Sequence, residues 1–233
     1  MGNPSFRFKQ FEIFHDRCAM KVGTDGVLLG AWAEPGKAER MLDVGAGSGL
    51  IALMLAQRSD AQVDGVEIDA EAAGQAAENV AAGPWPDRVH IFASDFGEYS
   101  NGYYDLIVSN PPFFRKSLKA PLKERNQARH TDTLSYEMLI RRSAQMLTFQ
   151  GRFSVIIPAD TADDFEAICW QNKLYLSRHC EVVSVEGLTP KRVLLEFSRN
   201  RGLIERSSLI LETSDHKPSS VFAAMTADFY MNK

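Results

Sequence analysis

The fold is decided by the stretch Met41-Leu42-Asp43-Val44-Gly45-Ala46-Gly47-Ser48-Gly49. Its opening residues form a mainly apolar run that predicts a buried strand, and the glycines that follow predict a tight turn. From Gly49 to Arg58, leucines and a methionine recur at helical spacing. A strand, a glycine-rich turn and a helix in this order begin a βαβ unit, so the sequence predicts a parallel sheet.

The same alternation of strand and helix continues from Glu39 to Pro158. Strands are expected at Val63–Ile68, Val89–Phe92, Tyr104–Ser109 and Phe153–Ile157, and helices at Ala70–Ala82, capped by Asp69, and from Ser135 to about Leu147. This rhythm indicates an α/β protein with helices on both faces of the sheet.

The last third of the chain changes character. A helix near Asp163–Gln171 precedes two β-rich segments, Leu176–Val185 and Val193–Phe197, which predict a closing hairpin. A β-like stretch at Leu209–Leu211 and a helix from Ser219 to Tyr230 follow. We expect one domain over residues 1–233, made of an N-terminal segment (1–38), a core (39–158) and a C-terminal part (159–233).

Composition limits the classes of protein to consider. The chain has 233 residues, 45% hydrophobic and 24% charged, which suits one soluble globular domain. A net charge of −4 means that any nucleic acid must be bound by a local basic patch. The scattered Cys18, Cys169 and Cys180 favour neither a disulfide framework nor a metal site. With no apolar run of membrane-spanning length, we expect a cytoplasmic protein, and nothing predicts more than a monomer.

The glycine-rich turn predicts a cofactor site, and its spacing selects the cofactor. Leu50 stands where a dinucleotide fingerprint needs Gly or Ala, and the Gly-Lys-Ser/Thr of a P-loop is absent. Asp43, two residues before Gly45, would repel a pyrophosphate but accept a hydrogen bond from an ammonium group or an ordered water. These features disfavour a nicotinamide oxidoreductase and predict a cofactor with a positive group and no phosphate.

Acidic residues follow the next two strands. Glu67 ends the second strand, where an acid can bind ribose hydroxyls, and Asp95 follows the third, where it can accept from an adenine amino group. Taken singly, each could equally be a cap or a surface acid. A positive charge, a ribose and an adenine together describe S-adenosylmethionine (SAM). The predicted cofactor-binding residues are Asp43, Gly45, Gly47, Gly49, Glu67 and Asp95.

The fourth strand leads into Asn110-Pro111-Pro112-Phe113. Two prolines fix φ and remove two backbone donors, so carbonyls here are held rigidly and remain free to accept. With the Asn110 side-chain oxygen they would form a two-acceptor clamp for an amino group, and Phe113 offers a stacking face. We therefore predict these four residues as the catalytic site for a planar amino substrate. The alternative is a proline-rich turn capped by an Asn.

The ordered motifs resemble those of the class I SAM-dependent methyltransferases. Three further segments, Phe8–Phe11, His15–Gly26 and Pro190–Leu195, resemble those of bacterial valine-tRNA adenine-N6 methyltransferases, which modify the adenine 3′ of the anticodon. The resemblance implies a Rossmann-like class I methyltransferase fold with a mostly parallel seven-stranded sheet and a C-terminal antiparallel hairpin. It also implies that Lys21, Thr24 and Asp25 lie over the cofactor, although Thr24 or Asp25 could simply cap a helix.

A basic run follows the clamp and makes tRNA the expected partner. Its members, the predicted RNA-binding residues, are Arg115, Lys116, Lys119, Lys123, Arg125 and Arg129. A local basic patch beside a site suits phosphate contacts, and the alternative is a solvated charged loop. N-terminal aromatics, Phe6, Phe8, Phe11 and Phe14, could form a stacking arm, but we expect at least half of them to be core.

Other functions remain open at this stage. The same clamp occurs in enzymes that methylate ribosomal-RNA guanine-N2 or protein glutamine-N5, which usually carry a substantial extra N-terminal domain. From another class, a non-catalytic SAM- or RNA-binding module would show damage in the glycine turn or the clamp, and both are intact in the sequence. The first expectation is a tRNA adenine-N6 methyltransferase that needs no metal.

Overall fold

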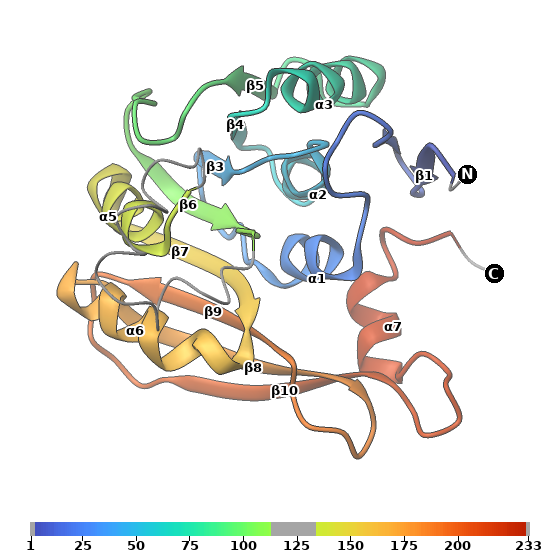
Figure 1. The fold of residues 1–233 in the computed structure, drawn as a ribbon, viewed down its shortest axis with the longest axis vertical. Coiled ribbons are helices and arrows are strands. Elements are labelled where there is room, and N and C mark those ends of the chain that lie inside the picture. Colours follow the sequence, from blue (N-terminus) through green and yellow to red (C-terminus); the bar gives the residue numbers. More distant parts are fainter. Residues whose placement is uncertain (1–2, 113–133, 232–233) are drawn as a thin grey trace, which may run out of the picture.

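The computed structural model describes residues 3–112 and 134–231. Its centre is an eight-stranded sheet with the order β10-β8-β9-β7-β6-β3-β4-β5 (Figure 1). The strands of this sheet are β3 (Arg40–Val44), β4 (Gln62–Glu67), β5 (Val89–Ala93), β6 (Tyr104–Ser109), β7 (Leu147–Pro158), β8 (Tyr175–Val185), β9 (Arg192–Ser198) and β10 (Glu205–Glu212).

The sheet is mostly parallel, as predicted. β3 pairs in parallel with both β4 and β6, so the chain builds outward through β4 and β5 and then returns to the other side of β3. The chain therefore changes direction across the sheet between β3 and β6, and their carboxyl ends form the topological switch point where open α/β sheets bind their ligands. The predicted C-terminal hairpin is confirmed, because β8 and β9 pair antiparallel.

The predicted strand count was wrong by one. The expectation was a seven-stranded sheet, whereas β10 adds an eighth strand that pairs in parallel with β8. Only a short part of β10 had been expected, because its first residues are exposed and polar and give no alternating pattern. A separate two-stranded sheet, β1 (Ser5–Arg7) with β2 (Glu12–Phe14), had no sequence signal either.

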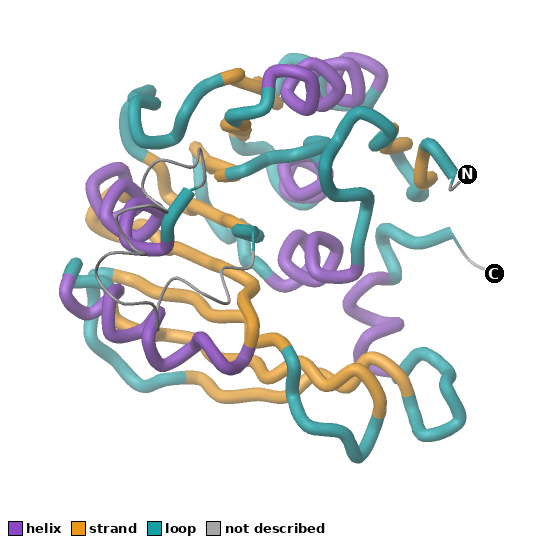
Figure 2. The backbone as a smooth tube through the Cα atoms, in the orientation of Figure 1, coloured by secondary structure: helices purple, strands orange, loops and turns teal. Residues whose placement is uncertain are grey.

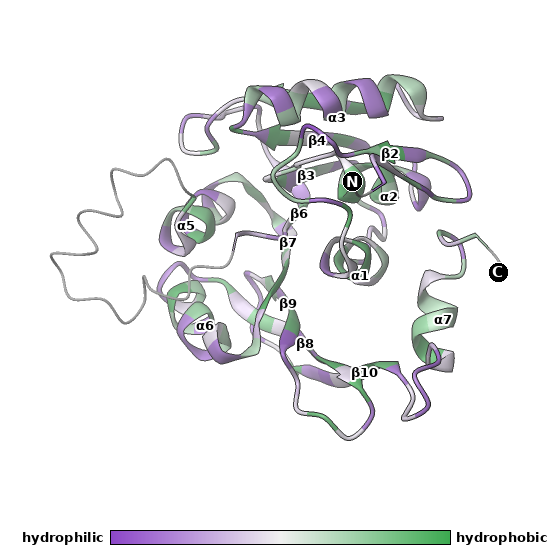
Figure 3. Ribbon diagram, turned by 45° about the vertical axis from the view of Figure 1, so that its right-hand side comes forward, coloured by the Kyte–Doolittle hydropathy of each residue, from purple (hydrophilic) through white to green (hydrophobic). Residues whose placement is uncertain are grey.

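Helices cover both faces of the sheet (Figure 2). One hydrophobic cluster lies under α1, α2 and the N-terminal segment, and a second lies under α5 and α6. The helices are α1 (Thr24–Trp32), α2 (Leu50–Gln57), α3 (Ala70–Ala82), α5 (Tyr136–Met146), α6 (Ala162–Gln171) and α7 (Ser220–Thr226), with a 3-10 turn η1 (Ala159–Thr161) before α6. In Figure 3, hydrophilic and hydrophobic stretches alternate along α3, as expected of a helix with one buried face.

The helix starts follow local side-chain chemistry. Asp69 Oδ1 accepts from the backbone N–H groups of Glu71 and Ala72, and Ser135 Oγ accepts from that of Met138, so both predicted caps are confirmed. Neither Thr24 nor Asp25 caps α1, whose N-cap is Gly23. At the other end of the chain, α7 ends at Thr226 rather than at Tyr230.

The N-terminal aromatics divide as expected between core and surface. Phe8 and Phe11 are buried, whereas Phe6 and Phe14 are exposed. Phe8 stacks on Phe11 with ring centroids 4.8 Å apart, and Lys9 N donates to Phe229 O at 2.8 Å. The first contact orders the N-terminal segment, and the second joins it to the C-terminal end of the described chain.

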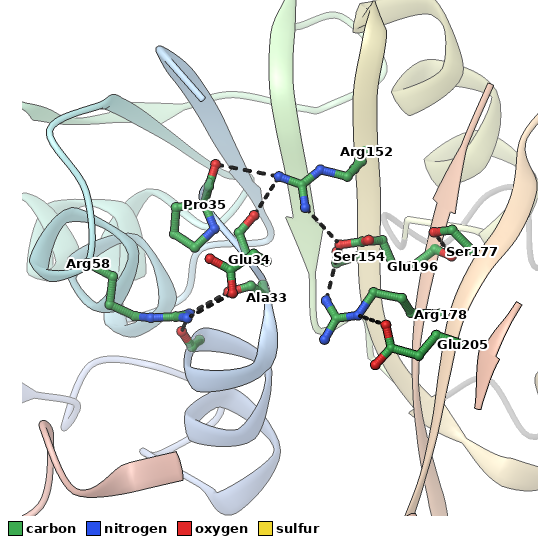
Figure 4. A network of polar contacts seen from close by, with 11 residues as sticks. Ala33, Glu34, Pro35, Arg58, Arg152, Ser154, Ser177, Arg178, Glu196 and Glu205 are labelled. Atoms are coloured by element: carbon green, nitrogen blue, oxygen red, sulfur yellow. Dashed lines mark hydrogen bonds and ion pairs between the residues drawn. The ribbon is translucent and has the colours of Figure 1, made fainter. Parts of the chain in front are cut away.

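A buried charge network joins the β7–β9 half of the sheet to the end of α1 (Figure 4). Glu196 on β9 is almost fully buried and forms ion pairs of 3.5 Å with both Arg152 and Arg178. Ser154 Oγ donates to the same carboxylate at 3.1 Å. Arg152 also donates to the carbonyl of Glu34, two residues after the end of α1. Glu196 is therefore the buried counter-charge that Arg152 and Arg178 share.

Candidate active site

A pocket of about 570 Å³ lies at the carboxyl edge of β3, β4, β5 and β6. This is the switch point of the sheet, so the topology alone predicts a ligand there. The described residues that line the pocket are Cys18, Ala19, Met20, Val44, Gly45, Gly47, Val66, Glu67, Ile68, Asp69, Ala72, Ser94, Asp95, Phe96, Asn110, Pro111, Pro112, Leu134 and Met138.

The glycine turn forms the floor of this pocket. Gly45, Gly47 and Gly49 have φ values of 73°, 53° and 80°, a region that residues with a Cβ rarely adopt. The backbone N–H groups of Gly45 and Ala46 both donate to Val66 O, which fixes the turn to the end of β4. The three glycines are therefore required by the backbone conformation, and Gly45 and Gly47 face the pocket.

Glu67 holds the turn and also lines the pocket. Its Oε2 accepts from Gly47 N at 2.8 Å, and its Oε1 accepts from Asp69 N at 3.0 Å. The carboxylate is partly exposed, so each oxygen keeps capacity for a further donor. Asp95 also lines the pocket and is exposed, and its Oδ1 accepts from Gly97 N at 2.7 Å. Both acids therefore have orientations fixed by backbone donors.

Asp43 lies behind the glycine turn rather than on the pocket wall. It is fully buried, and its Oδ2 accepts from Ala52 N, in the first turn of α2, at 3.2 Å. Its Oδ1 is buried without a partner in the described part of the chain. Burial raises the pKa of Asp43 to about 7, and the charge of Glu67 contributes to the same shift. The predicted contact of Asp43 with the cofactor's positive group stays a prediction.

Asp43 should make the unfolding free energy of the cofactor-free protein depend on pH. Because its pKa is about 7 in the folded state and 3.8 ordinarily, the folded protein holds a proton that the unfolded chain releases. The stabilisation that this proton contributes is complete below about pH 4, falls as the pH rises from 4 to 7, and is lost once the pH has passed through 7. Each pKa unit corresponds to about 1.4 kcal/mol. When the free energy of unfolding is measured in urea from pH 4.5 to 8, it should fall less for Asp43→Asn than for the wild type. The same pH dependence in both proteins would contradict the raised pKa of Asp43.

The clamp residues lie at the far side of the pocket from Glu67. Ser109 Oγ donates to Val44 O at 2.8 Å and joins the carboxyl ends of β6 and β3, so Asn110 follows a fixed strand end. Asn110, Pro111 and Pro112 all line the pocket. The side-chain oxygen of Asn110 is buried and has no hydrogen-bond partner among residues 3–112 and 134–231. A buried acceptor without a donor is costly, so this oxygen is suited to a donor on a ligand.

Several predicted site residues are not placed by the structure or lie elsewhere. Phe113 and the six basic residues from Arg115 to Arg129 fall outside the described residues, and their roles stay predictions. Lys21, Thr24 and Gly49 do not line the pocket. Asp25 forms an ion pair of 2.9 Å with Arg192 at the start of β9.

Sequence reasoning missed much of the pocket wall. Cys18, Ala19 and Met20 line the pocket, although they belong to the segment for which Lys21, Thr24 and Asp25 had been expected. Phe96, Leu134 and Met138 also line it. The position of Phe96 directly after Asp95 was a usable signal, whereas nothing in the sequence sets Leu134 or Met138 apart from core residues.

The described residues contain neither a candidate metal-binding cluster nor a membrane-spanning helix. Within the described ranges, no group of three or more His, Cys, Asp or Glu side chains could hold a metal ion. No helix among them is long and apolar enough to cross a membrane.

Comparison with known families decides the class of protein. The family model described as the methyltransferase small domain matches residues 21–162. The chain belongs to this methyltransferase family. The methyltransferase is a SAM-dependent enzyme, as the glycine turn and the two acids predicted.

Relatives match over the whole length of the methyltransferase. The protein named tRNA1(Val) (adenine(37)-N6)-methyltransferase from Bacteroides thetaiotaomicron is 47% identical over 235 residues, covering 100% of this chain and 99% of the relative. A protein of the same name from Phocaeicola vulgatus is 48% identical and both chains are covered completely. One from Pectobacterium carotovorum is 44% identical, with 97% and 93% of the two chains covered.

Solved structures support the fold of the methyltransferase. A predicted O-methyltransferase from Agrobacterium tumefaciens superposes with a TM-score of 0.69 at 18% identity, covering 88% of this chain and 96% of that one. A ribosomal protein L11 methylase from Lactobacillus delbrueckii gives a TM-score of 0.54 at 19% identity, with 76% and 78% covered. At such identities the similarity concerns the fold alone.

Proposed function

We propose that the methyltransferase transfers a methyl group from SAM to the exocyclic N6 of an adenine in tRNA, the adenine next to the anticodon of valine tRNA. One observation carries the proposal: the buried Asn110 oxygen, which has no hydrogen-bond partner in the described part of the chain, lies in the same pocket as the glycine turn and Glu67. An exocyclic amino group is the kind of donor that such an acceptor needs. The names of the full-length relatives support tRNA and adenine as the substrate.

The pocket residues divide between cofactor and substrate. Glu67, on the wall at the end of β4, would accept from the ribose hydroxyls of SAM, and Asp95 from its adenine amino group. The glycine turn would allow the methionine part to approach the backbone closely. Asn110 and Pro111 would then face the amino group of the target base from the end of β6.

Methyl transfer from a sulfonium is an in-line displacement in which the protein mainly positions and polarises. SAM, held by the glycine turn, Glu67 and Asp95, would supply the methyl group to N6 and would leave as a neutral thioether, and the methylated nitrogen would release its extra proton to solvent. The adenine nitrogen is a poor nucleophile because its lone pair is delocalised into the ring. Two acceptors, Asn110 Oδ1 and the Pro111 carbonyl, would favour a pyramidal nitrogen whose lone pair points at the methyl group.

The substrate RNA needs contacts beyond this pocket. We propose that Phe113 stacks on the target base, which contributes about 1–3 kcal/mol in comparable contacts. The chain as a whole has a net charge of −4, so RNA phosphates need a local cluster of basic residues to bind to. We also propose that the basic run from Arg115 to Arg129 is this cluster. A base beside an anticodon is already partly unpaired, so its extrusion costs less than in a duplex. A tRNA substrate would place the protein in the cytoplasm.

Two other enzymatic activities share the clamp chemistry, namely methylation of ribosomal-RNA guanine-N2 and of protein glutamine-N5. A non-catalytic module is opposed by the intact glycine turn, which lines the pocket, and by the Asn110 oxygen, which has no partner among the described residues.

The test uses purified protein, SAM labelled in its methyl group, and in separate reactions total tRNA, ribosomal RNA and a cell protein extract. After digestion, we expect label in N6-methyladenosine from tRNA, and sequencing should place it beside the valine anticodon. Label in guanosine or in protein would overturn the substrate, whereas SAM binding without any transfer would favour the non-catalytic module.

A further inference from the structure

Two amide side chains on the buried face of α3 contact the N-terminal segment rather than the hydrophobic core. Gln75 and Asn79 are each 2% exposed, one helical turn apart. A buried amide without hydrogen-bond partners destabilises a fold. The partners of these two amides therefore indicate which part of the structure they stabilise. Both form hydrogen bonds with residues 14–18, which lead directly to the pocket wall at Cys18, Ala19 and Met20, and Asn79 also bonds to Ser48.

Asn79 links the segment to the glycine turn. Its Oδ1 accepts from Phe14 N at 3.0 Å, and its Nδ2 donates to Phe14 O at 2.8 Å, as a peptide group would in a β ladder. The same Nδ2 donates its second hydrogen to Ser48 O at 2.9 Å. Asn79 therefore sets the position of Phe14 relative to the turn that forms the pocket floor.

Gln75 holds the next residues of the segment. Its Oε1 accepts from Arg17 N at 3.0 Å and from the Cys18 thiol at 3.2 Å, while its Nε2 donates to Asp16 Oδ1 at 2.6 Å. Burial raises the pKa of Cys18 to about 11, so the thiol stays protonated and can donate. Farther along, His15 Nδ1 accepts from Val22 N at 3.2 Å and closes the loop that contains residues 16–21.

We propose that Gln75 and Asn79 are positioning residues for SAM: they hold residues 14–18 against α3 so that Cys18, Ala19 and Met20 form one wall of the cofactor pocket. Neither amide is among the residues that line the pocket, so each acts through the segment. Gln75 gives the cleaner test, because its side-chain hydrogen bonds to described residues all go to the segment, whereas Asn79 also bonds to Ser48 in the glycine turn.

The experiment measures SAM binding by calorimetry, without RNA, so its result is independent of the substrate proposed above. Gln75→Met removes all three contacts at nearly constant volume and should raise the Kd for SAM about tenfold, on the scale of lost hydrogen bonds to buried groups. Gln57→Met is the matched control: its amide donates to Asp228 O at 2.9 Å, away from the pocket. The control should leave the Kd unchanged.

The exposed partner, Asp16, provides a second test that carries little risk of misfolding. Asp16→Ala removes the acceptor for Gln75 and should weaken SAM binding about threefold, whereas Asp16→Asn keeps a side-chain oxygen and should restore it. In turnover assays the loss should appear in KM for SAM, with kcat nearly constant. Wild-type affinity in folded Gln75→Met, or equal effects of Asp16→Ala and Asp16→Asn, would overturn the proposal. If Gln75→Met does not fold, the comparison of Asp16→Ala with Asp16→Asn tests the proposal on its own.

Discussion

Asn110→Ala should lower methyl transfer by about 100-fold or more while leaving SAM binding nearly intact. The substitution removes the buried oxygen that has no partner among the described residues, but it leaves the glycine turn and Glu67 in place. Such a rate loss raises the activation free energy by about 3 kcal/mol, which is comparable to the loss of one hydrogen bond to an oxyanion. The measurements are single-turnover rates with tRNA and calorimetry with SAM.

A control separates this effect from a general loss of stability. Asn172 donates to Ile168 O at the end of α6 and does not line the pocket, so Asn172→Ala should keep the wild-type turnover. Full activity in Asn110→Ala would mean that the Asn-Pro-Pro segment is only a turn. A parallel loss of SAM affinity and rate would instead assign Asn110 to the cofactor.

Local features of the fold could be predicted because their causes lie within a few residues. The caps Asp69 and Ser135 depend on a side chain and backbone N–H groups two or three positions away. The glycine turn depends on backbone conformations that the glycines themselves permit. The order of acids at successive strand ends then placed Glu67 and Asp95 in one pocket, because parallel strands bring their carboxyl ends to the same edge.

Features that depend on long-range pairing could not be predicted. β10 is largely exposed along its first half, and only its pairing with β8 identifies it as a strand. The pocket wall at Cys18–Met20 depends on Gln75 and Asn79, which in the sequence look like ordinary polar positions of an Ala-rich helix. In the same way, Glu196 is the one charged residue within Val193–Phe197, and only the burial of β9 along both faces shows that its carboxylate lies inside the protein.

Glu196→Ala should be the most destabilising of the substitutions considered. It removes a buried carboxylate and leaves Arg152 and Arg178 facing each other without the counter-charge that they share (Figure 4). Breaking a buried ion pair costs about 3–5 kcal/mol. The arginine side chains are 27% and 24% exposed, so water compensates in part and we expect about 3 kcal/mol. Urea unfolding of the cofactor-free protein measures this loss directly.

Two companion substitutions test whether charge or shape is responsible. Glu196→Gln keeps an acceptor for Ser154 Oγ but removes the charge, so it should fall between the wild type and Glu196→Ala. Glu205 contacts Arg178 at 3.9 Å with a side chain that is 71% exposed, and Glu205→Ala should cost less than about 1 kcal/mol. If Glu196→Ala proved no more destabilising than Glu205→Ala, the buried carboxylate would add no more to stability than an exposed ion pair does.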